Sequence, residues 1–177
     1  MKRCLVVVDY QNDFVAGSLG FAKAAELEKY IAKKVHSYHC NHDDVIFTLD
    51  THDENYLESQ EGILLPVVHC VKGTPGHQLY GQIASMVLKE DRCFYKHAFG
   101  SDALYEHLKT NTYDHIELVG LVSNICVLAN AVLAKTAQPE TSVSVDAKCT
   151  ASHDEQLHEA ALDVMVGMQI AVTGRLH

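Results

Sequence analysis

The sequence predicts one α/β domain over residues 1–177, a three-layer fold in which helices cover both faces of a six-stranded, mainly parallel sheet. Two observations lead to this fold class. Short runs of β-branched or aromatic residues alternate with longer segments of helical periodicity, which is typical of repeated βα units. A chain of 177 residues with 47% hydrophobic content can also form one sizeable core without a second domain.

Six apolar runs are interpreted as the strands. The first four are rich in valine, isoleucine, leucine and aromatic residues, the fifth alternates between polar and apolar residues, and the sixth follows the last predicted helix. The expected strands are residues 4–8, 45–49, 93–95, 115–122, 141–146 and 169–173.

Helices are expected where apolar residues recur every three or four positions. Residues 24–39 carry Leu27, Ile31 and Val35 on one face, and the stripe expected for residues 153–168 is Leu157, Ala161, Val164 and Met168. The other expected helices are residues 78–88, residues 102–108 with Ser101 as the N-cap, and residues 124–137 before Pro139. Residues 10–20 and 50–76 are expected to be irregular, and a loop as long as the second is usually functional.

Charge and cysteine usage limit the partners. The formal net charge of −9 and the pI near 5.7 argue against nucleic acid or an anionic membrane, so we expect a small-molecule substrate and a homo-oligomer. Six cysteines without a C-x-x-C pair suit reduced thiols in the cytoplasm. No stretch approaches the length of a membrane span, and the start of the chain lacks the features of a secretory signal.

Chemically reactive side chains follow four of the predicted strands. Asp9 and Asp50 come directly after the first two runs, Lys96 follows the third, and Cys126 follows the fourth after a short corner. The carboxyl ends of parallel strands lie along one edge of the sheet, where ligands bind in this architecture. We therefore expect these four side chains to share one site.

Cys126 lies near the start of the apolar helical stretch, so its thiol is expected in the first turn of a helix. Free N–H groups and the partial positive charge of a helix N-terminus lower the pKa of a thiol and favour a nucleophile. The alternative is a buried structural cysteine, because free cysteine is among the most buried residue types. This segment alone leaves both interpretations open.

Five motifs together resemble the cysteine hydrolase superfamily of nicotinamidases and isochorismatases. In that family's order they are VVVDYQNDF (residues 6–14), DTH (50–52), HCVKGTPG (69–76), KHAF (96–99) and GLVSNICV (120–127). The resemblance implies an isochorismatase-like fold and a catalytic triad of Asp9, Lys96 and Cys126. The chemistry agrees, since a carboxylate can take the proton of a thiol and an ammonium stabilises both charges.

The resemblance also implies a metal site at Asp50, His52 and His69. Two imidazoles and a carboxylate suit a divalent cation, with Zn²⁺ expected and Fe²⁺ or Mn²⁺ as alternatives. Family members often have a further ligand, and Glu58 and Glu61 remain alternatives for it here. Five other histidines are interpreted as solvated surface residues: His36, His39, His42, His153 and His158.

By the same resemblance, apolar side chains form a wall around a flat ring, and the backbone near Cys126 holds an oxyanion. Phe14, Leu19 and Phe99 are the expected wall, and Val122 and Ser123 lie beside the oxyanion. The peptide bond before Ser123 is expected to be cis, as is typical of the superfamily.

The resemblance and the chemistry together predict a nicotinamidase, which converts nicotinamide into nicotinate and ammonia through a thioester on Cys126. The first alternative is another hydrolase of the superfamily, either a ureido or carbamoyl amidase or an isochorismatase. A metal-free member of that kind would have no need of the three metal ligands. The second alternative is a catalytically silent binding member, against which the intact triad counts.

Overall fold

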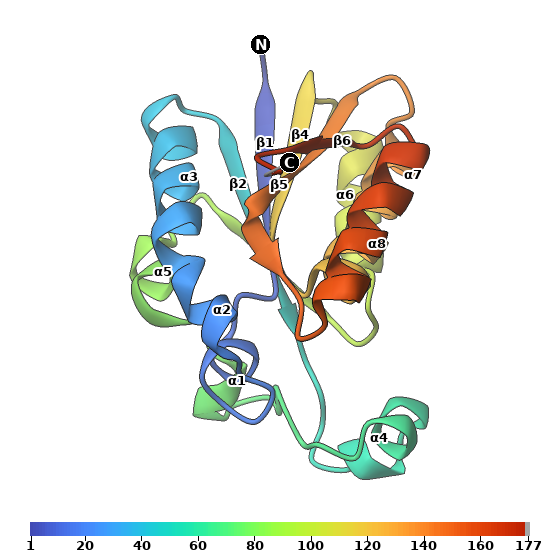
Figure 1. Ribbon diagram of the computed structural model, residues 1–177. Helices are drawn as coiled ribbons and strands as arrows, with labels where there is room; N and C mark the ends of the chain where they lie inside the picture. Colours follow the sequence, from blue (N-terminus) through green and yellow to red (C-terminus); the bar gives the residue numbers. More distant parts are fainter. Residues whose placement is uncertain (176–177) are drawn as a thin grey trace.

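A computed structural model describes residues 1–175 as one α/β domain, with a parallel sheet between two layers of helices (Figure 1). The strands of this part of the chain are β1 (Arg3–Val8), β2 (Asp44–Asp50), β3 (Arg92–Lys96), β4 (His115–Leu121), β5 (Ser142–Ala151) and β6 (Ala171–Thr173). Their spatial order is β3-β2-β1-β4-β5-β6, and every neighbouring pair is parallel. The predicted fold class is confirmed.

β1 forms the centre of the sheet because its apolar residues suit a strand that is covered on both faces. Residues 4–8 are fully buried, as is usual for the middle strand of a parallel sheet. The chain runs outward from β1 through β2 to β3 and then returns to β4 on the other side of β1. Such a change of direction opens a crevice at the carboxyl ends of the two strands. Asp9 and Cys126 follow the strands that flank this point.

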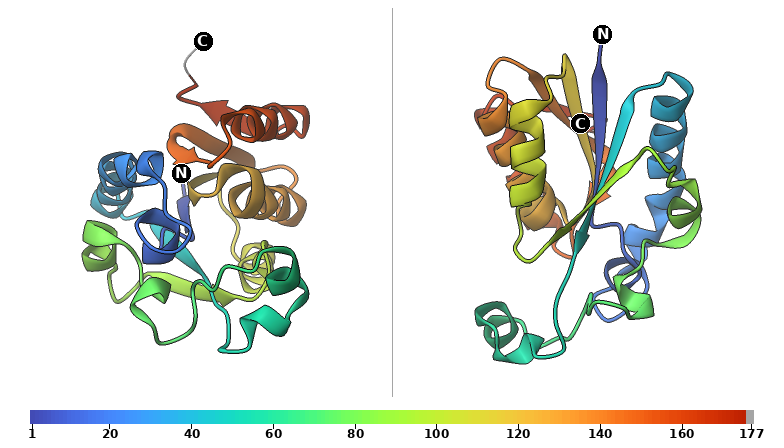
Figure 2. Two further views of the ribbon diagram at one scale, coloured as in Figure 1. Left: turned by 60° about the horizontal axis from the view of Figure 1, so that its bottom comes forward. Right: turned by 180° about the vertical axis from the view of Figure 1, so that it is seen from behind.

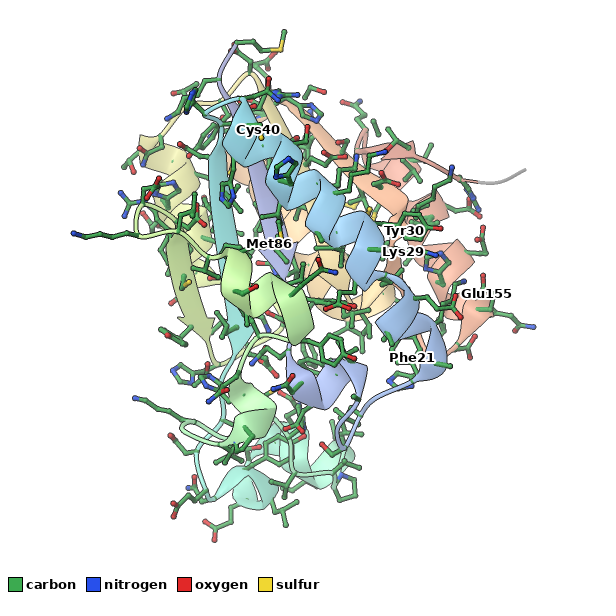
Figure 3. All side chains as sticks on the ribbon, turned by 90° about the vertical axis from the view of Figure 1, so that its left-hand side faces the viewer. Phe21, Lys29, Tyr30, Cys40, Met86 and Glu155 are labelled. Carbon is green, nitrogen blue, oxygen red and sulfur yellow. The ribbon has the colours of Figure 1, made fainter. Side chains whose placement is uncertain are left out.

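The helices of the described residues are α1 (Asn12–Val15), α2 (Ala22–Glu26), α3 (Glu28–Cys40), α4 (Gln60–Leu64), α5 (Gly81–Met86), α6 (Asp102–Thr110), α7 (Leu128–Ala137) and α8 (Glu155–Gly167). Helices α2, α3 and α5 lie on one face of the sheet and α6, α7 and α8 on the other, whereas α4 lies beyond the edge of the sheet (Figure 2). One hydrophobic cluster lies under α2, α3 and α5; of the residues labelled in Figure 3, Tyr30 is exposed on α3 and Met86 packs against the cluster. The other lies under α6, α7 and α8.

Several boundaries differ from those expected. The helix expected at residues 24–39 is interrupted at Leu27, and the loop 10–20 contains the single turn α1. β5 continues to Ala151 instead of ending at 146, because its pairing with β4 resumes after an irregularity in the register. β6 starts at Ala171, after Gln169 with a φ of +62°. Ser101 caps α6 as expected, since its hydroxyl accepts a hydrogen bond from the Leu104 N–H.

Of the expected apolar stripe of α8, only Ala161 is buried. Leu157, Val164 and Met168 are exposed, whereas the buried residues of this helix are His158, Ala161, Leu162 and Met165. The buried face is therefore displaced by one position from the expected stripe. This displacement places His158 in the interior.

Residues 51–68 form an arm that extends beyond the carboxyl edge of the sheet and carries α4 (Figure 1). We expected this stretch to be irregular, but it contains the 3₁₀ turn η1 (Tyr56–Glu58) and α4. The Tyr56 hydroxyl donates to the Leu65 carbonyl at 2.9 Å, which ties η1 to the residue that ends α4. A second 3₁₀ turn, η2 (Pro75–His77), follows the arm. Within residues 1–175, none of the helices has the length and apolar character needed to cross a membrane.

Candidate active site

The side chains of Asp9, Asp50, Lys96 and Cys126 meet at the carboxyl edge of the sheet. Lys96 Nζ lies 2.7 Å from Asp9 Oδ2, 2.9 Å from Asp50 Oδ1 and 3.5 Å from Cys126 Sγ. Asp50 and Lys96 end neighbouring strands and are partners in the β2–β3 register. All four side chains are buried. The structure therefore brings the four strand-end residues together, as expected.

Lys96 is the one cation among these buried groups. Burial lowers the pKa of an amine, but the charges of Asp9, Cys126 and Asp50 raise the pKa of Lys96 above its ordinary value. The ammonium also donates to the Ala98 carbonyl at 3.0 Å. Lys96 is therefore a fixed positive charge at neutral pH.

Asp9 is held by a turn that starts directly after β1. Its φ of +47° lies in the left-handed region, and its Oδ1 accepts a hydrogen bond from the Thr48 hydroxyl at 2.7 Å. Its Oδ2 lies close to Lys96 without the alignment of a hydrogen bond, so this oxygen can accept a proton from another donor. Burial raises the pKa of Asp9, although Lys96 and Thr48 act in the opposite direction. A buried carboxyl of this kind is suited to general acid–base chemistry.

Cys126 lies in a π-helical turn, η3 (Ser123–Val127), that leads into α7. We expected the helix N-terminus to lower the pKa of this thiol, but burial and the Asp9 carboxylate raise it, and Lys96 only partly opposes them. The thiol lies beside the Asp9 carboxyl, which can receive its proton.

The approach of β4 to β1 brings this turn close to Asp9. Gly120 has a φ of +112°, and a Cβ at this position would lie 2.0 Å from the Val8 carbonyl oxygen. Only glycine therefore allows the two strands to come so close at their carboxyl ends. The cis peptide bond joins Leu121 to Val122, one position earlier than the bond we expected before Ser123.

Asp50, His52, His69 and Glu61 form a cluster that could hold a metal ion, because each offers a ligand atom within 4.8 Å of the others. Asp50 Oδ2 lies 3.0 Å from His52 Nε2 and 3.5 Å from His69 Nε2. Glu61 Oε1 lies 3.9 Å and 3.8 Å from the same two nitrogens. Glu58 and Glu61 were the two alternatives for a fourth ligand, and the cluster contains Glu61 and not Glu58.

Hydrogen bonds with neighbouring groups fix the orientation of His69 and Asp50, as is usual for residues that bind a metal ion. His69 Nδ1 lies 2.7 Å from the Val67 carbonyl and donates to it, so Nε2 keeps its lone pair and faces the carboxylates. The side chain of Gln11 clamps the backbone of Asp50, accepting from its N–H at 2.8 Å and donating to its carbonyl at 2.9 Å. Burial raises the pKa of Asp50, but its contacts with His52, His69 and Lys96 lower it below its usual range overall. The donor set therefore fits a divalent cation.

A pocket of about 190 Å³ opens onto Cys126 and onto this cluster. Its wall includes Phe14, Leu19, Phe99 and Val122, all of which we expected near the substrate. Sequence reasoning missed Leu65, Ile125 and His153, which also line it. Leu65 comes from the α4 arm, and no periodicity in that segment indicated where it would lie. His153 is exposed, as expected, but one side of it faces the pocket.

Ser123 is close to Cys126 along the chain, but its side chain makes a contact outside the pocket wall. Its Oγ lies 2.8 Å from Nδ1 of His158, and both residues are buried. The expectation that His158 is solvated is wrong, because it lies on the buried face of α8. In the sequence, His158 precedes Ala161, Leu162 and Met165 at helical spacing, which forms a second apolar stripe beside the expected one.

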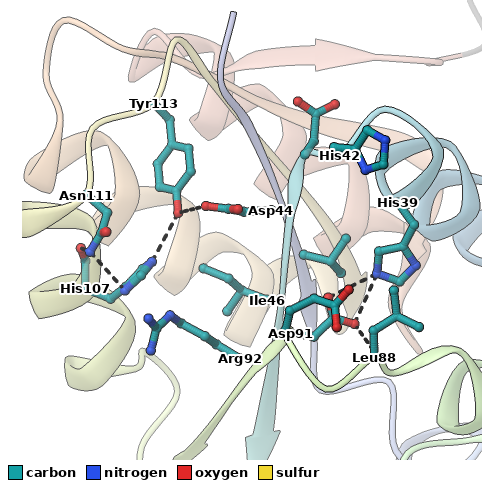
Figure 4. A pocket seen from close by; sticks show the side chains of 13 residues that line it. His39, His42, Asp44, Ile46, Leu88, Asp91, Arg92, His107, Asn111 and Tyr113 are labelled. Carbon is teal, nitrogen blue, oxygen red and sulfur yellow. Dashed lines mark hydrogen bonds and ion pairs between the residues drawn. The ribbon is translucent and has the colours of Figure 1, made fainter.

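A separate polar pocket of about 300 Å³ lies at the amino end of β2 and β3, away from these groups (Figure 4). His39 Nε2 is 3.1 Å from both oxygens of Asp91. The Tyr113 hydroxyl donates to Asp44 at 2.7 Å and lies 3.1 Å from His107 Nε2. His39 is therefore paired with a carboxylate instead of being solvated. These polar groups bond to one another and stabilise the end of the sheet.

Known proteins resemble this chain over most of its length. A family model described as the isochorismatase domain matches residues 3–175. An isochorismatase family protein of Bacillus subtilis is 31% identical over 97% of this chain and 100% of its own, and the nicotinamidase of Saccharomyces cerevisiae is 27% identical over 88% and 91%. The crystal structure of a nicotinamidase/pyrazinamidase from Bacillus subtilis matches with a TM-score of 0.88 and 29% identity, covering 98% of this chain and 100% of that one.

Proposed function

The chain belongs to the isochorismatase family, and from this premise we propose that it is a nicotinamidase, a cysteine amidohydrolase that forms nicotinate and ammonia. The observation that carries the proposal is that one pocket opens both onto Cys126 and onto the cluster of Asp50 and His69. An amide carbon can therefore lie at the thiol while a ring nitrogen on the same molecule faces the cluster. The names of the yeast and Bacillus relatives support this choice of substrate.

In the first half of the reaction, Cys126 Sγ attacks the amide carbon and its proton passes to Asp9 Oδ2, the oxygen that has no aligned hydrogen bond. Attack and proton transfer are coupled, because the Asp9 carboxyl lies beside the thiol. Lys96 stabilises the negative charge both when it is on Asp9 and when it is on sulfur, because its ammonium lies next to both groups. Backbone N–H groups of Cys126 and of the neighbouring Val122–Ser123 segment stabilise the oxyanion, a contribution worth about 3 kcal/mol per donor in other enzymes.

In the second half, Asp9 returns the proton to the leaving nitrogen, and ammonia departs. A water molecule then loses a proton to Asp9 and attacks the thioester. Nicotinic acid leaves as sulfur recovers the proton from Asp9, and the starting state is restored; the released acid loses its remaining proton to water and becomes nicotinate. Asp9 therefore serves in both halves, which requires a carboxyl that is protonated and deprotonated in turn.

Asp50, His52, His69 and Glu61 would hold a divalent cation, with zinc as the proposed ion and Fe²⁺ or Mn²⁺ as alternatives. When bound, the ion supplies a Lewis acid for the pyridine nitrogen of the substrate. Phe14 and His69 pack with ring centroids 5.4 Å apart, so the apolar wall and the cluster adjoin. A flat ring in the pocket would contact both.

We propose that the enzyme is located in the cytoplasm and that it is a homo-oligomer. All six cysteines are free thiols, which suits a reducing compartment. The exposed apolar side chains of Leu157 and Val164, which lie seven residues apart on one side of α8, offer a surface that a second copy would cover.

The test is ammonia release from nicotinamide and from benzamide, together with metal analysis of protein purified without added metal or chelator. We expect about one divalent ion per chain, and hydrolysis of nicotinamide far above that of benzamide, which lacks the ring nitrogen. Cys126→Ala protein is the control for background hydrolysis. Metal-free protein that cleaves both amides equally, or prefers a ureido substrate, would show that the assignment is wrong.

A further inference from the structure

Ser123, in the catalytic turn, and His158 form a buried pair whose side chains have no part in the proposed mechanism. Ser123 is the first residue of η3, the turn that carries Cys126 and its backbone N–H groups. Its hydroxyl lies 2.8 Å from His158 Nδ1, and α8, which carries His158, packs against η3. Ser123 is fully buried, and His158 is nearly so.

We propose that His158 is a positioning residue, which holds Ser123 and thereby fixes the turn that aims the thiol and the oxyanion donors. The inference rests on the proposed role of Cys126 as the nucleophile. It adds a residue from the last helix, far along the chain from the triad, to the machinery of the reaction. His158 itself does not line the pocket and touches no substrate.

The turn needs an external tether at its start. Its N-cap is Val122, whose side chain cannot accept a hydrogen bond from the first N–H groups of the turn. At the other end, Asn130 donates to the Cys126 carbonyl at 2.8 Å and secures the exit into α7. The Ser123–His158 bond is the counterpart of that contact at the entrance.

The direction of the bond follows from the surroundings of the imidazole. Burial lowers the pKa of His158, so the ring is neutral and has one donor and one acceptor. Its Nε2 faces the Glu159 carboxylate at 3.9 Å, which favours the proton on Nε2. Lys23 and Arg175 pair with Glu155 and Glu159 around it and balance their charge. Nδ1 therefore accepts the hydrogen bond that the Ser123 hydroxyl donates.

If Nδ1 of His158 is the acceptor for Ser123, the substitutions His158→Asn and His158→Leu should have different effects. In His158→Asn, the side-chain oxygen replaces Nδ1 as the acceptor near Ser123. In His158→Leu, the volume is largely retained but no acceptor remains, and a buried hydroxyl is left unpaired. A role in packing alone predicts that the leucine variant is the better tolerated of the two.

The first experiment is steady-state hydrolysis of nicotinamide by His158→Asn, His158→Leu, Ser123→Ala and the double variant Ser123→Ala/His158→Leu. Small displacements of reacting groups can lower the rate by about a hundredfold. We expect His158→Leu and Ser123→Ala to lower kcat tenfold to a hundredfold, with KM changed less than about threefold, because ground-state binding is retained. The double variant should be no slower than the worse single variant, because both changes break the same bond. His158→Asn should keep kcat within about threefold of the wild type.

The second experiment does not depend on the substrate. The rate at which iodoacetamide alkylates Cys126 is measured in a background where the exposed thiol is removed by Cys40→Ser. We expect this rate to change severalfold in His158→Leu and Ser123→Ala and to stay near the wild-type value in His158→Asn. If the wild type fails to cleave nicotinamide but this pattern holds, the substrate is wrong and the positioning role stands. Asparagine and leucine variants that are equally impaired, or effects that multiply in the double variant, would overturn the positioning role.

Discussion

Replacing Lys96 with methionine removes the cation that separates two buried carboxylates. Lys96 Nζ lies within 3 Å of both Asp9 and Asp50, and all three side chains are buried. Methionine retains most of the volume, so the loss is electrostatic rather than steric. Removing one partner of a buried ion pair typically costs about 3–5 kcal/mol. For a domain of this length, that corresponds to a fall in Tm of roughly 6–20 °C.

The pH dependence of this loss has a defined sign. The pKa of Asp9 is already raised in the folded protein, and loss of Lys96 raises it further. The folded state then holds a proton that the unfolded chain has released, so this contribution favours folding at pH values below the unfolded pKa and is lost as pH rises through the folded pKa. The deficit of Lys96→Met relative to the wild type should therefore be larger at pH 7 than at pH 5.

The assay is urea unfolding followed by far-UV circular dichroism at both pH values, after removal of metal with a chelator. Lys109→Met is the matched control, because Lys109 forms an exposed pair with Glu106 that is worth at most about 1 kcal/mol. If Lys96→Met is as stable as this control at pH 7, the carboxylates are not held as charged groups by Lys96 and the electrostatic reasoning is refuted.

Three further predictions concern the chemistry. Cys126→Ala should abolish turnover without changing the unfolding midpoint, and mass spectrometry should detect the acyl-enzyme in the wild type only; residual amidase activity would remove the covalent mechanism. Asp9→Asn should lower kcat by about 10²–10⁴-fold, since it loses the proton carrier for both halves, and a loss below tenfold would assign that role elsewhere. Phe14→Ala should weaken nicotinamide binding by about tenfold through lost burial and stacking while sparing a small aliphatic amide, and unchanged KM for both would place the ring elsewhere.

The sequence predicts the sheet and the meeting of its strand-end residues because both follow from local patterns. A β-branched run such as residues 4–8 suits only a buried strand, and parallel strands then bring Asp9 and Lys96 to one edge without further information. The environment of Cys126 could not be derived in this way. Its thiol lies in a helical first turn, as expected, but its pKa depends on burial by segments that are distant along the chain, and burial outweighs the turn.

His158 and the α4 arm escaped prediction for related reasons. On α8 the exposed Leu157 and Val164 are as apolar as the buried Leu162, so hydrophobicity alone gave two stripes and no basis for choosing between them. The arm contains no element longer than α4, and its shape depends on single contacts such as that between Tyr56 and Leu65. Such a contact leaves no periodic trace in the sequence.

Lys96 also limits how this site can diverge. Its ammonium bonds to Asp50, which belongs to the proposed cation site, and lies against Asp9, which belongs to the proton path. The two halves of the centre are therefore not separate modules. A descendant protein that lost the cation ligands by mutation of Asp50 would change the charge balance at sulfur in the same step. If such a protein evolved to use substrates that need no cation, other residues around Lys96 would have to change as well. Those compensating changes could occur only in certain orders.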